Sequence, residues 1–199
     1  KAGKPVCVHL TESEFPYGVL LDRLDGGDIL CHCFQGRGEH TILGANGRIG
    51  AAALRARERG VLFDAAVGRV NCDFKVAAAA LADLFLPDIV STDLVGTSVY
   101  NHKLFHLLYV MSAFLALGMT LPEVVRACTA IPAARMGMSG RIGTLVPGAQ
   151  ADVAIIRLRE RPLRFSDGKG NGIEGSQLLV PLATLKSGRL VYKRIDFEY

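Results

Sequence analysis

The runs PVCVHLTE (residues 5–12), GDILCHCFQG (residues 27–36) and PDIVSTDLVG (residues 87–96) combine apolar stretches with side chains that bind divalent metals. These side chains are His9, His32 and Asp93. Short apolar runs that end in a ligand are typical of a parallel α/β barrel, because the carboxyl ends of its strands and the following loops line one mouth. The three runs therefore predict strands that lead to a metal-dependent hydrolase site.

Strand and helix patterns alternate through the first two thirds of the chain. The predicted strands are residues 5–10, 28–33, 61–67 and 88–92, and the predicted helices are about 14–24, 47–59, 73–84 and 102–117. This order predicts an α/β fold with a parallel sheet or barrel.

The pattern changes near residues 135–140, where we place a domain boundary. Beyond it come closely spaced glycines, a Pro-Gly turn and alternating runs, and the last two runs are joined at Ser187 and Gly188. These features predict a small β element. Within it, RFSDGKGNGIEG (residues 164–175) has little apolar content, so we expect a mobile loop there.

Composition limits the classes of function. A chain of 199 residues with 50% hydrophobic content can bury a core. No stretch approaches the roughly 18 apolar residues of a membrane span, and the start lacks the regions of a signal peptide. Five cysteines in apolar surroundings favour reduced thiols in a cytoplasmic protein. The chain begins at Lys1, so we expect it to be part of a longer one.

The basic residues do not form a nucleic-acid-binding pattern. The net charge is +4, and its excess lies mainly in RLRERPLRF (residues 157–165) and KSGRLVYKR (residues 186–194). A nucleic-acid interface would interleave basic and aromatic residues on a recognisable module, and this pattern is weaker. A solvated basic surface, or one that meets another subunit, is the better interpretation.

Two cysteines flank one of the candidate ligands. Cys31 and Cys33 lie on either side of His32. The alternation of the predicted strand directs both thiols to the face opposite His32. We therefore do not expect either thiol to bind the metal.

Together these stretches resemble the carboxyl-terminal half of the amidohydrolase superfamily, closest to its amidohydrolase/deacetylase metallohydrolase group and related to dihydroorotases. The three opening runs and ERGVLFDAAVGR (residues 58–69) resemble barrel strands five to eight. GMTLPEVVRACTAIPAARMG (residues 118–137) resembles the last barrel helices, and GTLVPGAQADVAII (residues 143–156) resembles the return to a small β-sandwich. The resemblance implies that residues 1–137 are the second half of a (β/α)8 TIM barrel and that residues 138–199 are a β-sandwich segment.

The resemblance also implies a binuclear metal centre, usually zinc, that hydrolyses an amide, a cyclic amide or an acyl ester of a small molecule. His9 and His32 would bind the more exposed metal. Asp93 would bind the buried metal and act as the catalytic proton carrier. The substrate contacts implied by position are Tyr100, His102 and Gly68. Gly68 follows Val67 where the close group often carries a His-Gly pair.

Two alternatives stay open. The family supplies a His-x-His pair from the first strand and a carboxylated lysine from the fourth, and this sequence contains no His-x-His pair. A non-catalytic barrel fragment or pseudoenzyme scaffold is therefore the second functional hypothesis. Single residues also have alternative interpretations. Asp93 is a candidate helix cap or turn former after Ser91 and Thr92. Asp64 is a candidate support for the mouth, and His40 is expected to be a solvent-facing loop residue. As partners we expect a small-molecule substrate, no nucleic acid and no membrane, and either a second copy of the chain or a complementing amino-terminal segment.

Overall fold

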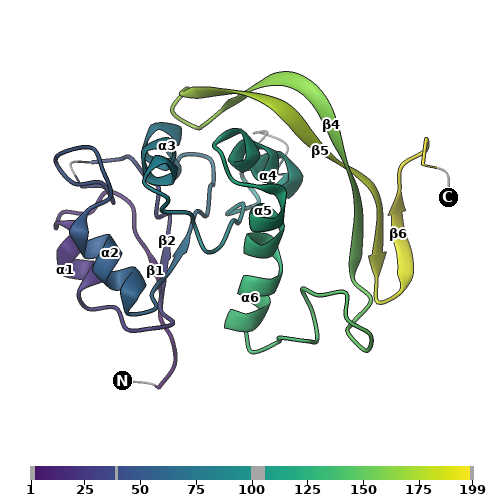
Figure 1. Cartoon of the computed structure of the whole chain (residues 1–199), viewed down its shortest axis with the longest axis horizontal. Coiled ribbons are helices and arrows are strands. Elements are labelled where there is room, and N and C mark those ends of the chain that lie inside the picture. The colour runs from purple at the N-terminus through teal and green to yellow at the C-terminus, as the bar shows by residue number, and fades with distance from the viewer. Residues whose placement is uncertain (1–2, 39, 100–105, 198–199) are drawn as a thin grey trace.

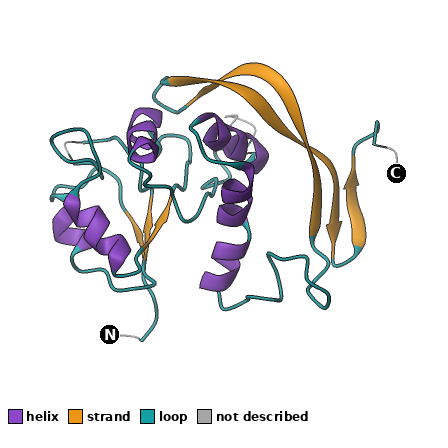
Figure 2. Cartoon of the chain, in the orientation of Figure 1, coloured by secondary structure: helices purple, strands orange, loops and turns teal. Residues whose placement is uncertain are grey.

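The computed structural model describes residues 3–38, 40–99 and 106–197, which form two small sheets and six helices (Figures 1 and 2). The strands are β1 (Cys7–His9), β2 (Ile29–Cys31), β3 (Leu62–Asp64), β4 (Val153–Ser166), β5 (Gly172–Lys186) and β6 (Arg189–Lys193). The helices are α1 (Tyr17–Leu21), α2 (Ala51–Glu58), α3 (Phe74–Ala82), α4 (Leu107–Ala116), α5 (Leu121–Cys128) and α6 (Ala130–Arg135). None of the helices in these ranges is long and apolar enough to cross a membrane.

The first sheet is parallel, in the order β1-β2-β3, as the alternation of strands and helices predicted. Its register places His9 beside Cys31 and Cys31 beside Asp64. An isolated parallel bridge from Asp64 to Ile89 continues the sheet at the position of the fourth predicted strand. Leu30 and Phe63 are fully buried in the hydrophobic core, and strand alternation places the row of His9, Cys31 and Asp64 on the opposite face.

The predicted elements are present, but most are shorter than expected. The first three strands have three residues each, and the fourth is reduced to the bridge at Ile89. The described residues form an open sheet and no closed barrel. The short strands have a local cause, because β2 stops at Cys31 and His32 turns out of the extended conformation with a positive φ of 57°.

The second sheet is antiparallel, in the order β4-β5-β6, and it confirms the predicted β element. In Figure 1 the long β4–β5 hairpin arches from the right of the molecule over α4 and reaches α3 with its tip. Phe165 near the end of β4 is fully buried and packs edge-to-face against Tyr109 of α4, with 5.0 Å between ring centroids. The hairpin is therefore attached to the helices by a buried aromatic contact.

The prediction of a mobile loop at residues 164–175 was wrong. Asp167 is only 3% exposed and forms hydrogen bonds with its own turn and with α3. The expectation rested on low apolar content, but this turn is held by polar contacts to a distant part of the chain. A local composition rule does not detect such contacts.

A second link between the hairpin and the helices is a buried serine. Ser112 of α4 is fully buried, donates to the Leu108 carbonyl at 2.6 Å and accepts from the Leu179 amide of β5 at 2.9 Å. Without the hydroxyl, that amide would lose its partner in a site that water does not reach.

We expect Ser112→Ala to lower the free energy of unfolding by about 1–3 kcal/mol, because it leaves the Leu179 amide unpaired. Urea denaturation followed by circular dichroism would measure the change. Ser139→Ala is the matched control, because Ser139 is exposed, and we expect a change within about 0.5 kcal/mol. Equal effects of the two substitutions would contradict the role assigned to Ser112.

Candidate metal centre at the ends of the parallel strands

His32 is the most constrained of the predicted ligands. Its side chain is 1% exposed, and its Nδ1 lies 2.6 Å from the Ala66 carbonyl oxygen. A carbonyl can only accept, so Nδ1 carries the proton and Nε2 keeps a free lone pair. Burial lowers the pKa of His32, an effect that the hydrogen bond to Ala66 partly offsets. The ring is therefore held neutral, in the tautomer that a metal ligand needs.

Asp93 lies opposite the free nitrogen of this ring. Its Oδ2 is 4.0 Å from Nε2 of His32, and its side chain is 34% exposed. It follows the Asp64–Ile89 bridge, and the amide of Gly68 donates to the carbonyl of Thr92 at 3.1 Å. None of the described helices uses Asp93 as a cap, and the cap of the next one, α4, is His106. The interpretation of Asp93 as a helix cap is not supported in the described residues.

His9 completes the group of three predicted ligands. It ends β1 and is exposed, and its ring packs edge-to-face against that of His32 with 4.3 Å between centroids. The three side chains therefore meet at one edge of the sheet. Within residues 3–38, 40–99 and 106–197, no three His, Cys, Asp or Glu side chains form a group that could enclose a metal ion. The three are neighbours without forming a complete coordination shell.

The backbone around these side chains is strained. Among the described residues, four of the six non-glycine residues with positive φ follow the ends of β1, β2, β3 and the bridge at Ile89: Glu12, His32, Ala66 and Asp93. A left-handed conformation costs such residues of the order of 1–3 kcal/mol and is common at functional sites. This clustering is consistent with a functional edge.

Asp64 supports the site, as its position at the end of β3 suggested. It is 9% exposed and accepts from the Ser91 hydroxyl at 3.0 Å and from the Ala66 amide at 2.9 Å. Burial raises the pKa of Asp64, whereas its hydrogen bonds from Ala66 and Ser91 lower it. Because the carbonyl of Ala66 also holds His32, Asp64 fixes that ring through a single residue.

The expectation that both flanking thiols point away from His32 was wrong for Cys31. Cys31 shares the face of His9 and Asp64, and its Sγ lies 4.0 Å from Asp64 Oδ2 and 3.2 Å from Cys7 Sγ. The alternation argument fails because the strand ends at Cys31 and His32 belongs to a turn. Cys33 is fully buried in the hydrophobic core, and its backbone amide donates to the Asp64 carbonyl at 3.1 Å.

Sequence reasoning missed Asn71. Its Nδ2 lies 3.5 Å from both His32 Nε2 and Asp93 Oδ2, so its side chain lies between the two candidate ligands. Asn71 lies in the loop that follows β3, at the carboxyl ends of the parallel strands. This position in the sequence is the one signal that could have marked it as a site residue. Of the predicted substrate contacts, Gly68 is buried beside Asp93, whereas Tyr100 and His102 lie outside the described residues.

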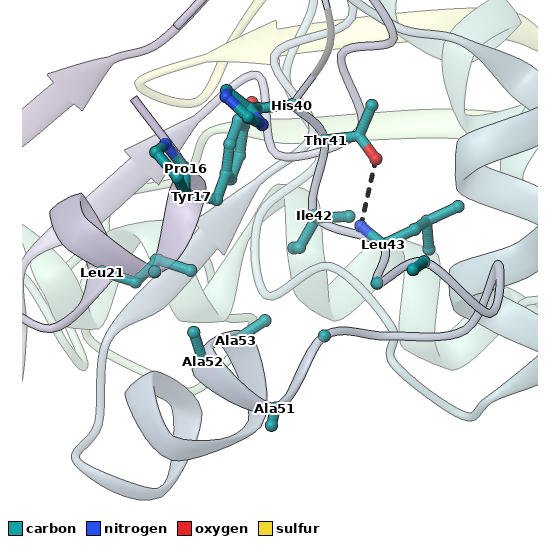
Figure 3. A pocket seen from close by; sticks show the side chains of 14 residues that line it. Pro16, Tyr17, Leu21, His40, Thr41, Ile42, Leu43, Ala51, Ala52 and Ala53 are labelled. Carbon is teal, nitrogen blue, oxygen red and sulfur yellow. Dashed lines mark hydrogen bonds between the residues drawn. The ribbon is translucent and has the colours of Figure 1, made fainter. Parts of the chain in front are cut away.

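A separate pocket of about 470 Å³ lies where α1 and α2 begin (Figure 3). Tyr17, Ile42 and Ala52 are among the residues that line it. His40 also lies on this pocket, in the loop after β2. It is partly buried, so the expectation of a solvent-facing loop residue holds only in part.

Comparison with known proteins places this geometry in a family. The model of the Amidohydrolase family matches residues 114–192. The chain is 33% identical over 179 residues to the deacetylase Atu3266 of Agrobacterium fabrum, covering 89% of this chain and 43% of that protein. A solved structure of an adenine deaminase superposes with a TM-score of 0.89 at 28% identity, and the match covers 96% of this chain and 51% of that one. This chain belongs to the amidohydrolase superfamily.

Two further members of the superfamily agree. A dihydroorotase structure superposes with a TM-score of 0.83 at 30% identity, covering 95% of this chain and 51% of that one. A deacetylase of Enterococcus faecalis is 26% identical over 186 residues, covering 94% of this chain and 50% of the relative. The chain thus spans about half the length of the curated relatives it matches.

We expect Gly68→Ala to disturb the edge of this amidohydrolase sheet. Gly68 has a φ of +56°, and an added Cβ would lie 2.7 Å from Asp93 Oδ2. The conformation alone costs about 1–2 kcal/mol for a residue with a Cβ. Thermal unfolding should show at least that loss, and Gly96→Ala should show almost none, because nothing lies within 4 Å of its added Cβ. A tolerated Gly68→Ala would mean that Asp93 is not held against this backbone.

Proposed function

We propose that this chain is the carboxyl-terminal half of a metal-dependent hydrolase that cleaves an amide or cyclic amide bond, or an acyl ester, of a small molecule. In this proposal residues 1–137 provide strands five to eight of a (β/α)8 barrel, and residues 138–199 form a β-sandwich segment. The names of the similar proteins, which include deacetylases, an adenine deaminase and a dihydroorotase, support hydrolysis at carbon–nitrogen bonds.

The observation that carries the proposal is the meeting of His9, His32 and Asp93 at one edge of the parallel sheet. The donor set suits a divalent metal such as zinc, because two neutral imidazoles and a carboxylate are common ligands of that ion. The hydrogen bond from His32 to Ala66 adds support, since ligand histidines usually donate their other ring N–H to a carbonyl or carboxylate.

In the proposed site His9 and His32 would hold the more exposed metal, and Asp93 would bind the buried metal and carry a proton. A divalent metal at such a site lowers the pKa of water and polarises a carbonyl oxygen. The carboxylate of Asp93 can accept the proton of the attacking water and deliver it to the leaving nitrogen. Asn71 Nδ2 lies 3.5 Å from Asp93 Oδ2 and can orient this carboxylate as a hydrogen-bond donor.

A non-catalytic scaffold is the second candidate, and one observation favours it. The described residues contain no complete group of metal ligands, and the sequence has no His-x-His pair to add to the three that meet. A catalytic site therefore requires ligands from another segment or another copy.

We expect about two divalent ions per chain in protein purified without chelator when the missing ligands are present, and fewer when they are absent. Both His32→Ala and His9→Ala should lower the metal content measured by inductively coupled plasma mass spectrometry. His9 is exposed, so its substitution tests the site with little risk to folding.

His40→Ala is the control for this measurement, because His40 lines the separate pocket and should keep the metal. Hydrolysis assays with N-acyl amino acids and cyclic amides should follow the metal content across the variants. If the protein binds no zinc, cobalt or manganese even when the complementing segment is present, the metal-centre proposal is refuted and the scaffold is favoured.

The sheet also implies a partner that covers it. Cys7 and His9 are exposed on the face that a closed barrel would enclose, and Val6 beside them is 52% exposed. Unpaired parallel edges invite association. We propose that a second copy or a complementing amino-terminal segment pairs with the unpaired side of β1 and covers the face that carries Cys7 and His9.

Size-exclusion chromatography with light scattering should therefore show an oligomer of the isolated chain. Val6→Lys should shift the population toward monomer, because a charge on an edge strand opposes pairing. Leu84→Lys is the control, since Leu84 is 85% exposed and lies at the end of α3, away from β1. A stable compact monomer of the parent chain would contradict the proposal.

A further inference from the structure

The tip of the β4–β5 hairpin, residues 166–171, is organised around a buried carboxylate. Asp167 Oδ1 accepts from the amides of Lys169 at 2.8 Å and Asn171 at 2.9 Å. Its Oδ2 accepts from the Asn171 side chain and from the amide of Phe74, both at 2.9 Å. Phe74 is the first residue of α3, so one side chain both shapes the tip and joins it to the parallel-sheet half of the chain.

The same tip contacts two loops that leave the parallel sheet. Lys169 Nζ donates to the carbonyl of Gly36, in the loop after β2, and lies 3.3 Å from Asp73 Oδ2, in the loop after β3. Asn171 Nδ2 donates to Asp73 Oδ1 at 3.2 Å. Gly168 approaches the second loop so closely that an added Cβ would overlap the carbonyl of Arg69. The hairpin tip therefore holds both loops at once, as its position over α3 in Figure 1 indicates.

Both loops lead directly to the candidate metal centre. Gly36 stands four residues after His32 in the loop that begins with it. Asp73 caps α3, and its amide donates to the Phe34 carbonyl at 2.9 Å, which ties the two loops to each other. Asn71 precedes Asp73 by two residues and lies 3.5 Å from His32 Nε2.

We propose that the hairpin tip is a positioning element for the candidate metal centre, with Lys169 and Asp167 as its positioning residues. The tip fixes Asp73 and the backbone at Gly36, and these fix where Asn71 and His32 stand. The small sheet thus determines the geometry of a site to which it contributes no ligand. The effect on metal binding rests on the proposed function, whereas the effect on the loops does not.

The charges explain why the lysine matters. The Asp73 side chain is 12% exposed, and Lys169 Nζ is the cation that faces it. A largely buried carboxylate is costly unless it is paired, so removal of the ammonium favours rearrangement of the loop that carries Asp73. Gly168→Ala acts by a different route, because it pushes the tip away from Arg69 without changing any charge.

The test compares Lys169→Met with Lys186→Met. Both lysines belong to the β4–β5 hairpin and pair with an aspartate. Lys169 lies in its tip, whereas Lys186 ends β5 and pairs with Asp152 at the opposite end of the hairpin. We expect Lys169→Met to weaken Co²⁺ or Zn²⁺ affinity about 10–100-fold, as loss of an outer positioning contact does at metal sites. Lys186→Met should leave the affinity unchanged. Lys169→Arg, which restores the cation, should recover much of the loss.

Two readouts separate positioning from a general loss of stability. Titrations would be made at a temperature where circular dichroism shows every variant folded. Amide hydrogen exchange of the metal-free chain should speed up at residues 33–38 and 69–73 in Lys169→Met and Gly168→Ala. It should not change there in Lys186→Met.

The outcomes are distinct. Unchanged affinity and unchanged loop exchange in Lys169→Met would overturn the positioning role. A parent chain that binds no metal even with the complementing segment added would refute the proposed function, and loop exchange alone would then decide whether the tip holds the loops. If Lys169→Met lost metal affinity while amide hydrogen exchange in the loops was the same in all variants, the proposal would also be overturned. The substitution would then affect the metal site by some means other than the loops.

Discussion

The parallel register of β1, β2 and β3 is the constraint on which the candidate site depends. Parallel pairing aligns His9, Cys31 and Asp64 in one row, so the loops that follow these residues all leave from the same edge. The strands have only three residues each, and an abrupt turn follows β2. This turn, with a positive φ at His32, brings the ring back toward His9, and the hydrogen bond to Ala66 holds it there.

The sequence was a good guide wherever a pattern is local. Apolar runs predicted all three strands and the bridge at Ile89, because burial of alternating or continuous apolar side chains is a property of the run itself. The chemistry of the strand ends then predicted that His9, His32 and Asp93 would meet, and the structure brings them together. Their role as metal ligands stays a prediction, because proximity is not coordination.

The sequence was a poor guide wherever distant residues supply the partners. Nothing near Asn71 shows that it would lie between His32 and Asp93. The low apolar content of residues 164–175 suggested a mobile loop, whereas Asp167 is buried because its hydrogen-bond donors include an amide 93 residues away. The direction of the Cys31 side chain was predicted wrongly, because side chains alternate between faces only within a strand. Here β2 ends at Cys31, and the strained residue His32 begins a turn.

These features together describe a site whose parts are held from outside the sheet. The three-residue strands supply too few ladder hydrogen bonds to fix long loops by themselves, so additional contacts determine where those loops lie. Asp64 provides one such contact through Ala66, and Lys169 provides another from a separate sheet through Asp73. A site supported in this way can keep strained residues at its edge, because the cost of each left-handed residue is offset by contacts made elsewhere. These contacts join the hairpin to the loops of the parallel sheet, across the boundary that the sequence pattern predicts near residues 135–140.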